Sequence, residues 1–248
     1  MVRSLLVFLS FSTFFVTCVV MSQVSESDLL LVVTEEWAPY SYKQADGKIV
    51  GSSTAVVEQT LRNSDIPYTL NLYPWARSYE LALTTPNVLL YSTIRTPERE
   101  DLFHWVCPLN SVEYFIFKLE SRKDIVINSL NDLKEYSIGV TRGTFLTDFF
   151  KQKGLIEGTH LQLTGDNQAN LKNLLSSRVD LIIDTQEYID AHLDKKNIKA
   201  NYVRSTYHLN AEMDGINNTC MAISLKTPMV VVDKIRNEHR KLRDKAQD

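Results

Sequence analysis

The run from Tyr91 to Glu100 combines residue types that suit the binding of a small anion. It follows an apolar, strand-like segment and offers the hydroxyls of Ser92 and Thr96 and the guanidinium of Arg99. Pro97 suits the first turn of a helix, whose free backbone N–H groups attract negative charge. A guanidinium can donate two parallel hydrogen bonds to a carboxylate. The sequence therefore predicts that a strand end opens here into a site for a carboxylate-bearing ligand.

Arg99 also has a simpler explanation, because Glu98 or Glu100 could pair with it on a solvated helix. Its position directly after the Thr96-Pro97 step favours the ligand-binding role. The neighbouring Arg95 is open to either role, and we assign it none.

The elements that must position this site follow an alternating pattern. Apolar runs alternate with helical patterns along most of the chain, which predicts βαβ units and largely parallel sheets. A first α/β series begins at the strand predicted over residues 29–33, and a second follows an extended aromatic stretch at 112–118. A last strand and a Lys- and Arg-rich helix return the chain to the first series. We therefore predict lobe 1 from residues 23–111 and 205–248, and lobe 2 from residues 112–204.

The N-terminal segment predicts export. Arg3 precedes an apolar stretch from Leu5 to Val20, which is short for a membrane-spanning helix and typical of a secretory signal peptide. We expect residues 1–22 to be removed by cleavage after Ser22, which places the protein in the periplasm. The alternatives are a lipid anchor on Cys18, whose preceding residues fit that signal poorly, and an uncleaved anchor.

Composition excludes several classes of function. The formal net charge of the chain is -3, and basic runs are absent, so nucleic acid is not an expected partner. The five histidines are scattered without metal-ligand spacing, and Gly143-Thr144 lacks the pattern of a phosphate-binding loop, so we expect no metal and no cofactor. Cys107 and Cys220 could form a disulfide in an oxidising compartment, although we favour two buried free thiols.

Several short motifs occur in a distinctive order along the whole mature chain. They are Trp37-Ala38-Pro39-Tyr40, Gly51, Pro74-Trp75 with Arg77, Thr96-Pro97-Glu98-Arg99, Ser129-Leu130-Asn131-Asp132-Leu133, Gly139-Val140 with Gly143-Thr144, Arg178-Val179-Asp180, and Ala222-Ile223-Ser224 before Thr227-Pro228. Each motif is weak alone, but together they resemble the family-3 extracellular solute-binding proteins, the polar amino-acid receptors of bacterial ABC importers. The resemblance implies an α/β type II periplasmic-binding-protein fold with two lobes, two hinge segments and a ligand cleft between the lobes.

The resemblance also implies a set of ligand-binding residues. Indole rings would form the apolar walls, hydroxyls would donate hydrogen bonds, Arg99 would bind the carboxylate, and a helix N-terminus in lobe 2 would favour the same anion. The residues in these roles are Trp37 and Trp75 as walls, Ser92 and Thr96 as hydroxyls, and Arg142, Gly143 and Thr144 at the helix N-terminus.

One departure from the family pattern concerns the group that would hold an α-amino group. The expected aspartate falls five residues after Asp180, where this chain has Thr185, and Asp184 is one residue early. On a strand a one-residue shift turns a side chain to the opposite face, unless a bulge or the strand end restores it. We include Asp184 among the ligand-binding residues and leave the identity of the solute open.

The resemblance implies a monomeric receptor without enzymatic activity. It would capture a small polar solute by closure of the lobes and deliver the solute to an ABC-type membrane permease. One alternative is an enzyme of the same fold, a dehydratase or a wall-cleaving protein, which would need Glu35 or Glu36 as its acid or base. Another is a module that presents its ligand state to a membrane sensor.

Overall fold

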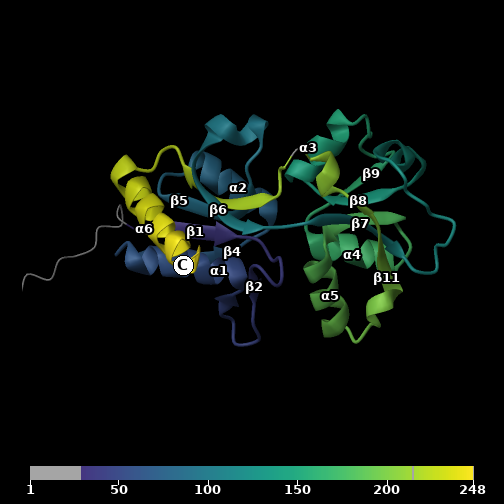
Figure 1. The fold of residues 1–248 in the computed structure, drawn as a ribbon, viewed down its shortest axis with the longest axis horizontal. Helices are drawn as coiled ribbons and strands as arrows, with labels where there is room; N and C mark the ends of the chain where they lie inside the picture. The colour runs from purple at the N-terminus through teal and green to yellow at the C-terminus, as the bar shows by residue number, and fades with distance from the viewer. Residues whose placement is uncertain (1–28, 214, 248) are drawn as a thin grey trace, which may run out of the picture.

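The computed structural model describes residues 29–213 and 215–247, and it forms two α/β bodies that lie side by side (Figure 1). Each body is built on a five-stranded sheet, and we call them lobe 1 and lobe 2. The segment predicted to be a signal peptide lies outside the described residues. None of the helices within the described ranges has the length and apolar character that crossing a membrane would require.

Lobe 1 has helices on both faces of its sheet, so its central strands are buried along almost their whole length and are mostly apolar. Helices α1 and α6 contribute to the hydrophobic cluster on one face and α2 to the cluster on the other. The strands, in sheet order, are β4 (Tyr68–Leu72), β1 (Leu30–Thr34), β5 (Val88–Ile94), β12 (Asn218–Ser224) and β6 (Phe103–Ser111). The other elements are α1 (Ser52–Asn63), α2 (Trp75–Thr84), α6 (Met229–Gln247), the 3-10 helix η2 (Pro97–Leu102) and the β2–β3 hairpin (Tyr42–Lys43 and Ile49–Val50).

Lobe 2 is also built on a five-stranded sheet, and its hydrophobic cluster extends to Trp37, Tyr40 and Ile94 of lobe 1. Its strands, in sheet order, are β11 (Val203–His208), β7 (Tyr114–Leu119), β10 (Leu181–Thr185), β8 (Ile138–Thr141) and β9 (Leu161–Thr164). Its helices are α3 (Phe145–Gln152), α4 (Asn167–Leu175) and α5 (Gln186–Lys195), with short 3-10 helices η3 (Leu130–Glu135), η4 (Ala200–Tyr202) and η5 (Asn210–Glu212). Asp166 caps α4 by accepting a hydrogen bond from the backbone N–H of Ala169.

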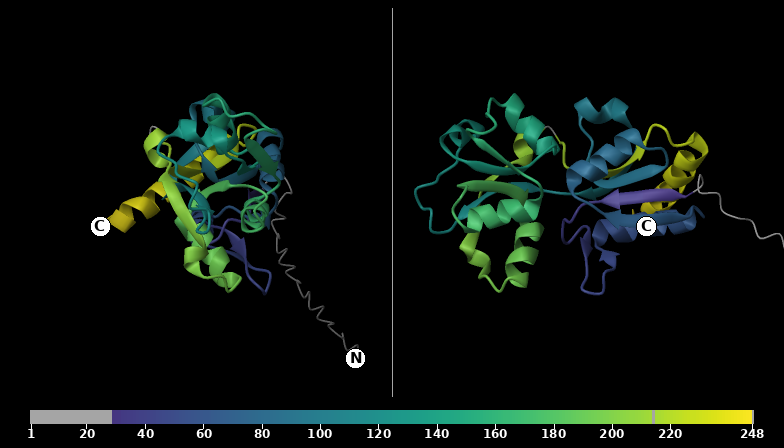
Figure 2. Two further views of the ribbon diagram at one scale, coloured as in Figure 1. Left: turned by 90° about the vertical axis from the view of Figure 1, so that its right-hand side faces the viewer. Right: turned by 180° about the vertical axis from the view of Figure 1, so that it is seen from behind.

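The chain crosses between the lobes twice, as the rear view in Figure 2 shows. The first crossing joins β6 to β7, and the second joins β11 to β12. Strand β11 pairs with β7 in lobe 2, so the chain stays in lobe 2 at least to His208. The boundary predicted at residue 205 is therefore too early, because an antiparallel edge strand extends past it.

Cys107 and Cys220 form a disulfide bond between the neighbouring strands β6 and β12. The expectation of two free thiols was wrong. The antiparallel pairing of the two strands brings the Cα atoms to 4.7 Å, across a sequence separation of 113 residues. Such a long-range pairing leaves no local trace in the sequence.

The start of α1 fixes the loop that carries Trp37. No described side chain caps α1, and its first backbone N–H groups donate to the carbonyls of Pro39 and Tyr40. Gly51 precedes the helix with a φ of 132°, a conformation that only glycine adopts readily. The helix and the loop after β1 are thereby held together.

Candidate ligand-binding cleft

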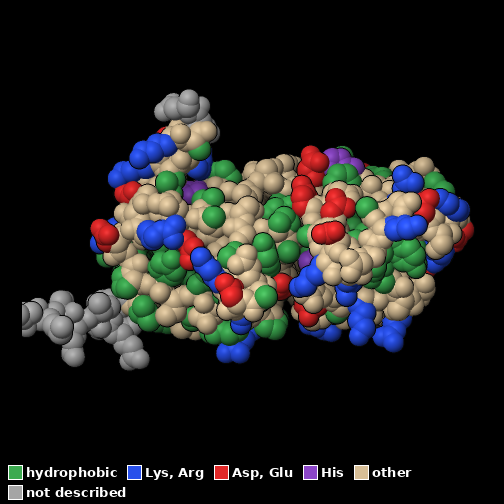
Figure 3. All heavy atoms as spheres, turned by 90° about the horizontal axis from the view of Figure 1, so that it is seen from below, with side chains coloured by type: hydrophobic (Ala, Val, Ile, Leu, Met, Phe, Trp, Pro, Cys, Tyr) green, Lys and Arg blue, Asp and Glu red, His purple; other side chains and the backbone are tan. Residues whose placement is uncertain are grey.

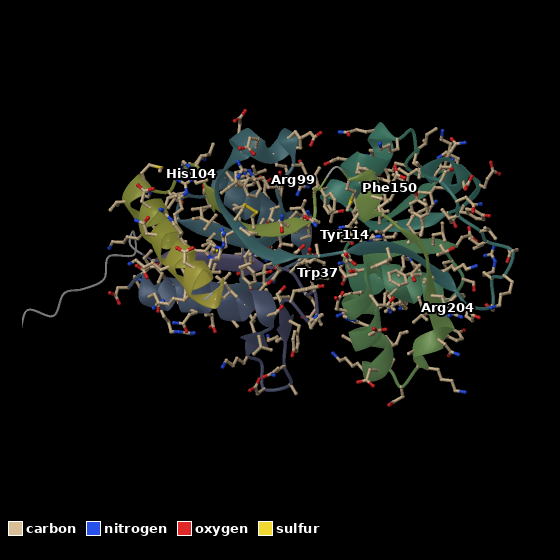
Figure 4. All side chains as sticks on the ribbon, viewed as in Figure 1. Trp37, Arg99, His104, Tyr114, Phe150 and Arg204 are labelled. Atoms are coloured by element: carbon tan, nitrogen blue, oxygen red, sulfur yellow. A yellow bond between two sulfur atoms is a disulfide. The ribbon has the colours of Figure 1, made fainter. Side chains whose placement is uncertain are left out.

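A cleft between the two lobes collects most of the predicted site residues. Figure 4 shows that Trp37, Arg99 and Tyr114 lie in the region where the lobes face each other, whereas Phe150 and Arg204 lie within lobe 2. The cleft is lined by Glu35, Trp37, Trp75, Ser92, Ile94, Arg99, Tyr114, Val140, Thr141, Thr144, Phe145, Leu146, Asn167, Ile183 and Asp184. The cleft is partly open to solvent, and its cavity volume of about 40 Å³ has room for only a few water molecules. A solute of amino-acid size needs more room than this, which the lobes can supply by moving apart.

Arg99 is buried in this cleft, with 4% of its surface exposed. Its Nη2 donates to the carbonyl of Gly143 at 3.2 Å, and its guanidinium lies 4.9 Å from the ring centroid of Tyr79. No described residue accepts a hydrogen bond from its Nη1. Burial lowers the pKa of Arg99 from its ordinary value, although arginine remains charged at neutral pH. The guanidinium therefore points inward and suits an anion that is not part of the described chain.

Neither neighbouring glutamate pairs with Arg99. Arg95, on the exposed side of the turn, forms the ion pair with Glu100. Glu98 accepts a hydrogen bond from Gln152 of lobe 2 at 3.0 Å. The simpler explanation for Arg99 in the sequence, a solvated ion pair with an adjacent glutamate, does not apply.

Ser92 supplies a second polar group without a partner in the same cleft. It lies within β5 but has a φ of 62°, a left-handed conformation that is unfavourable for a serine. Its Oγ is buried and has no hydrogen-bond partner among the described residues. Strained backbone and unpaired buried polar atoms concentrate at functional sites. Ser92 and Arg99 thus present hydrogen-bonding capacity to the same space.

The two predicted tryptophan walls also connect the lobes. Trp37 Nε1 donates to Asp184 Oδ1 at 2.8 Å, and Trp75 Nε1 donates to the carbonyl of Gly143 at 2.8 Å. The ring of Trp37 stacks on Tyr114 with 6.2 Å between centroids. Each indole therefore forms part of the cleft wall and stabilises the closed arrangement by a hydrogen bond to lobe 2.

Replacing Trp37 with phenylalanine should loosen this closure. The variant keeps an aromatic wall but loses the indole N–H, and hydrogen bonds to charged groups contribute about 1.5–3 kcal/mol. We expect the ligand-free variant to be more open, with a larger radius of gyration in small-angle scattering than the parent protein. Tyr40→Phe is the control, because it removes a longer cross-lobe bond, from the Tyr40 hydroxyl to Glu187 at 3.3 Å. Equal radii for Trp37→Phe and the parent would show that this bond does not hold the lobes together.

Asp184 reaches the cleft despite its one-residue offset. It lies near the C-terminal end of β10, and its Oδ1 accepts hydrogen bonds from Trp37 Nε1 and from the backbone N–H of Thr185 at 2.9 Å. Thr185 instead caps α5, because its Oγ1 accepts from the backbone N–H of Tyr188 at 3.1 Å. The strand end thus gives the two residues different roles, and the acid is the one that faces the cleft.

The remaining predicted residues divide between the cleft and its surroundings. Thr144 lines the cleft, and Gly143 offers its carbonyl to Trp75 and Arg99. Thr96 is buried but lines a neighbouring groove. Arg142 does not reach the cleft: its side chain is 64% exposed and pairs with Glu157 at 3.5 Å. Its placement in the site was wrong, because its neighbours Gly143 and Thr144 turn the chain towards the cleft and its own side chain points to solvent.

Sequence reasoning missed several residues that the lobes bring together. The sequence indicates Glu35 only as a possible enzymatic acid, although its position directly after β1 and near Trp37 is a signal for the cleft edge. Tyr114, Thr141 and Asn167 also line the cleft, and no motif marks them. Burial and the nearby carboxylates, first Asp184, raise the pKa of Glu35 to about 8, and burial raises the pKa of Asp184 to about 7.

The described residues contain no group of three or more His, Cys, Asp and Glu side chains placed to hold a metal ion. Charged side chains of both signs are interspersed over the face shown in Figure 3. The cleft holds two buried polar atoms that are unpaired within the described chain, Arg99 Nη1 and Ser92 Oγ, and we take it as the candidate site of this chain.

Comparison with solved structures identifies the fold. An ancestral arginine-binding protein bound to arginine superposes with a TM-score of 0.73 at 17% identity, covering 88% of this chain and 93% of that one. The arginine-, lysine-, histidine-binding protein ArtJ of Geobacillus stearothermophilus gives 0.73 at 16% identity, covering 88% and 90%. A histidine kinase sensor domain with similarity to periplasmic binding proteins gives 0.73 at 15% identity, covering 88% and 91%. No protein-family model matches the chain. The chain has the two-lobed α/β fold of periplasmic-binding proteins, as predicted.

Proposed function

We propose that this protein is a periplasmic solute-binding protein of the family-3 type, which captures an amino acid or a close relative between its lobes and delivers it to an ABC importer. The observation that carries the proposal is the pair of unpartnered buried atoms, Arg99 Nη1 and Ser92 Oγ, in one cleft with Asp184. A carboxylate of the solute would accept from Arg99 and Ser92. An ammonium group would lie towards Asp184. The ligands named for two of the structural neighbours, arginine and the basic amino acids, agree with this chemistry.

Closure supplies the signal that a permease would recognise. The solute would contact Arg99 and Ser92 of lobe 1 and Asp184 of lobe 2, so it would favour the closed state by its differential affinity for that state. The cross-lobe hydrogen bonds of Trp37 and Trp75 support this mechanism, because they stabilise an arrangement in which the lobes contact each other.

A thermal-shift screen with the common amino acids and their organic-acid analogues tests the proposal. A solute present at about 100 times its Kd should stabilise the protein by about 2.7 kcal/mol. Isothermal titration should then give one site per chain. If no amino acid or organic acid raises the melting temperature, the receptor proposal is wrong. If the protein converts a bound solute and Glu35→Gln abolishes this conversion, the protein is an enzyme and not a receptor.

A sensory role is the second candidate, and the likeness to a histidine kinase sensor domain favours it. The cleft would bind the same solute, but the closed form would contact a membrane sensor in place of a permease. Affinity capture from membranes with and without the identified solute separates the two, because the partner recovered only with solute would be either a permease or a kinase.

A further inference from the structure

Glu35 holds a carboxyl group in the wall of the cleft with only 9% of the residue exposed. Its backbone carbonyl accepts a hydrogen bond from Ser41 Oγ at 2.9 Å. Its carboxyl group has no hydrogen-bond partner in residues 29–213 and 215–247. A buried carboxylate without donors or a cation is costly to ionise.

The groups that face Glu35 make ionisation harder still. Asp184 approaches from the end of β10 in lobe 2 and is 3% exposed. The other titratable groups around the two acids are also acidic: Asp166 before α4, Tyr114 on β7, Tyr188 on α5 and Tyr40 in the loop after β1. Arg99 lines the same cleft from lobe 1. The cleft therefore holds one guanidinium together with two buried carboxyl groups.

Closure of the lobes brings these two acids into one cleft, because one carboxyl group belongs to each lobe. We propose, resting on the receptor function above, that Glu35 and Asp184 form one acid pair whose negative charge must be balanced in the closed cleft by a cationic group of the solute or by a proton. A solute with an ammonium group opposite its carboxylate meets this requirement by itself. A plain carboxylic acid binds Arg99 but carries no cation, so the acid pair must take up a proton.

The selectivity of the site should therefore increase with pH. The closed complex with the plain acid holds about one more proton than the complex with the amino acid, whatever the resting state of the lobes. The ratio of the two affinities should rise by up to about tenfold per pH unit, between about pH 6 and pH 8.5. The acid pair thus makes the receptor reject organic acids most strongly in neutral and alkaline surroundings.

Three matched pairs of probes suit the measurement: L-alanine with propionate, L-leucine with 4-methylpentanoate, and L-glutamate with glutarate. Isothermal titration at pH 6.0 and 8.5 gives the ratio of affinities within each pair that binds. We expect the ratio to favour the amino acid at both pH values and to rise at least tenfold between them. A ratio that does not change with pH, with binding intact, overturns the acid pair and leaves the receptor function standing.

Glu35→Gln should flatten the pH dependence of the ratio and lower the affinity for the amino acid more than that for its analogue. Glu36→Gln is the matched control, because Glu36 lies outside the cleft, where it accepts from the backbone N–H of Lys43. It should behave like the parent protein.

A readout without solute tests the pair independently. A folded-state pKa above the unfolded value means that the folded protein holds more protons, so stability falls as pH rises from about 4.5 towards 8. The melting temperature of the parent protein should therefore fall more steeply from pH 5 to pH 8.5 than that of Glu35→Gln. Parallel profiles would overturn the acid pair even if no probe binds. If the profiles diverge but no solute of the thermal-shift screen binds, the receptor function alone is overturned.

Discussion

Substitution of Arg99 by methionine is expected to weaken solute binding by about 100-fold or more, because two charge-assisted hydrogen bonds to a carboxylate are lost. The thermal shift seen with the solute should disappear at concentrations that saturate the parent protein. Without solute, the variant should be as stable as the parent or more stable, since a buried cation without a carboxylate partner among the described residues has been removed. Titration calorimetry and a melting curve check the two expectations.

Arg95→Met is the matched control. Arg95 lies four residues earlier, is 44% exposed, and pairs with Glu100 on the surface. This change should leave the affinity for the solute unchanged and cost at most about 1 kcal/mol. The solute affinity of Arg99→Lys should lie between those of the parent protein and Arg99→Met, because an ammonium group retains the charge but not the two parallel donors. Unchanged binding in Arg99→Met would remove the basis of the proposed site.

Replacement of Gly51 by alanine should destabilise the protein by about 3 kcal/mol or more. An added Cβ would lie 2.2 Å from the carbonyl oxygen of Tyr40, and the backbone φ of 132° is itself unfavourable for alanine. The clash cannot be relieved by a side-chain rotation, because the opposing atoms belong to the backbone that caps α1. We expect the melting temperature to fall by about 10 °C, measured by circular dichroism.

Gly158→Ala separates the steric effect from the backbone effect. Gly158 also has a positive φ, 79°, but an added Cβ would meet no atom within 4 Å. It should cost only about 1 kcal/mol. If the two variants have the same melting temperature, the contact between Gly51 and Tyr40 is not the cause of the destabilisation. Gly51→Ala should also weaken solute binding, because Trp37 belongs to the loop that would move.

The order of strands and helices was predictable from the sequence because it depends on local pattern. The central strands of lobe 1 contain short apolar runs between helical segments, and Pro74 and Pro97 mark helix starts that the structure contains. What failed depended on distant parts of the chain. The pairing of β11 with β7 and the contact between Cys107 and Cys220 are set by the tertiary arrangement, so neither the lobe boundary nor the disulfide could be derived.

The candidate site was predictable where a residue type and its local setting agree. Arg99 follows a strand and a Thr-Pro step, and it enters the cleft. Arg142 has an equally suggestive setting, but its side-chain direction depends on the turn at Gly143, which sequence does not determine. The unusual φ of Ser92 depends on backbone geometry, and the presence of Glu35 and Asp184 in one cleft depends on the docking of the two lobes. No periodicity in the sequence could indicate either feature.

The bond between Cys107 and Cys220 makes a ring of the whole second lobe, because all of β7 to β11 lies between these two cysteines. The chain leaves lobe 1 and re-enters it beside one covalent junction. A protease that cuts an exposed loop of lobe 2 would therefore yield two fragments that migrate together until a reductant is added. A single nick would thus leave the two parts of the protein covalently attached.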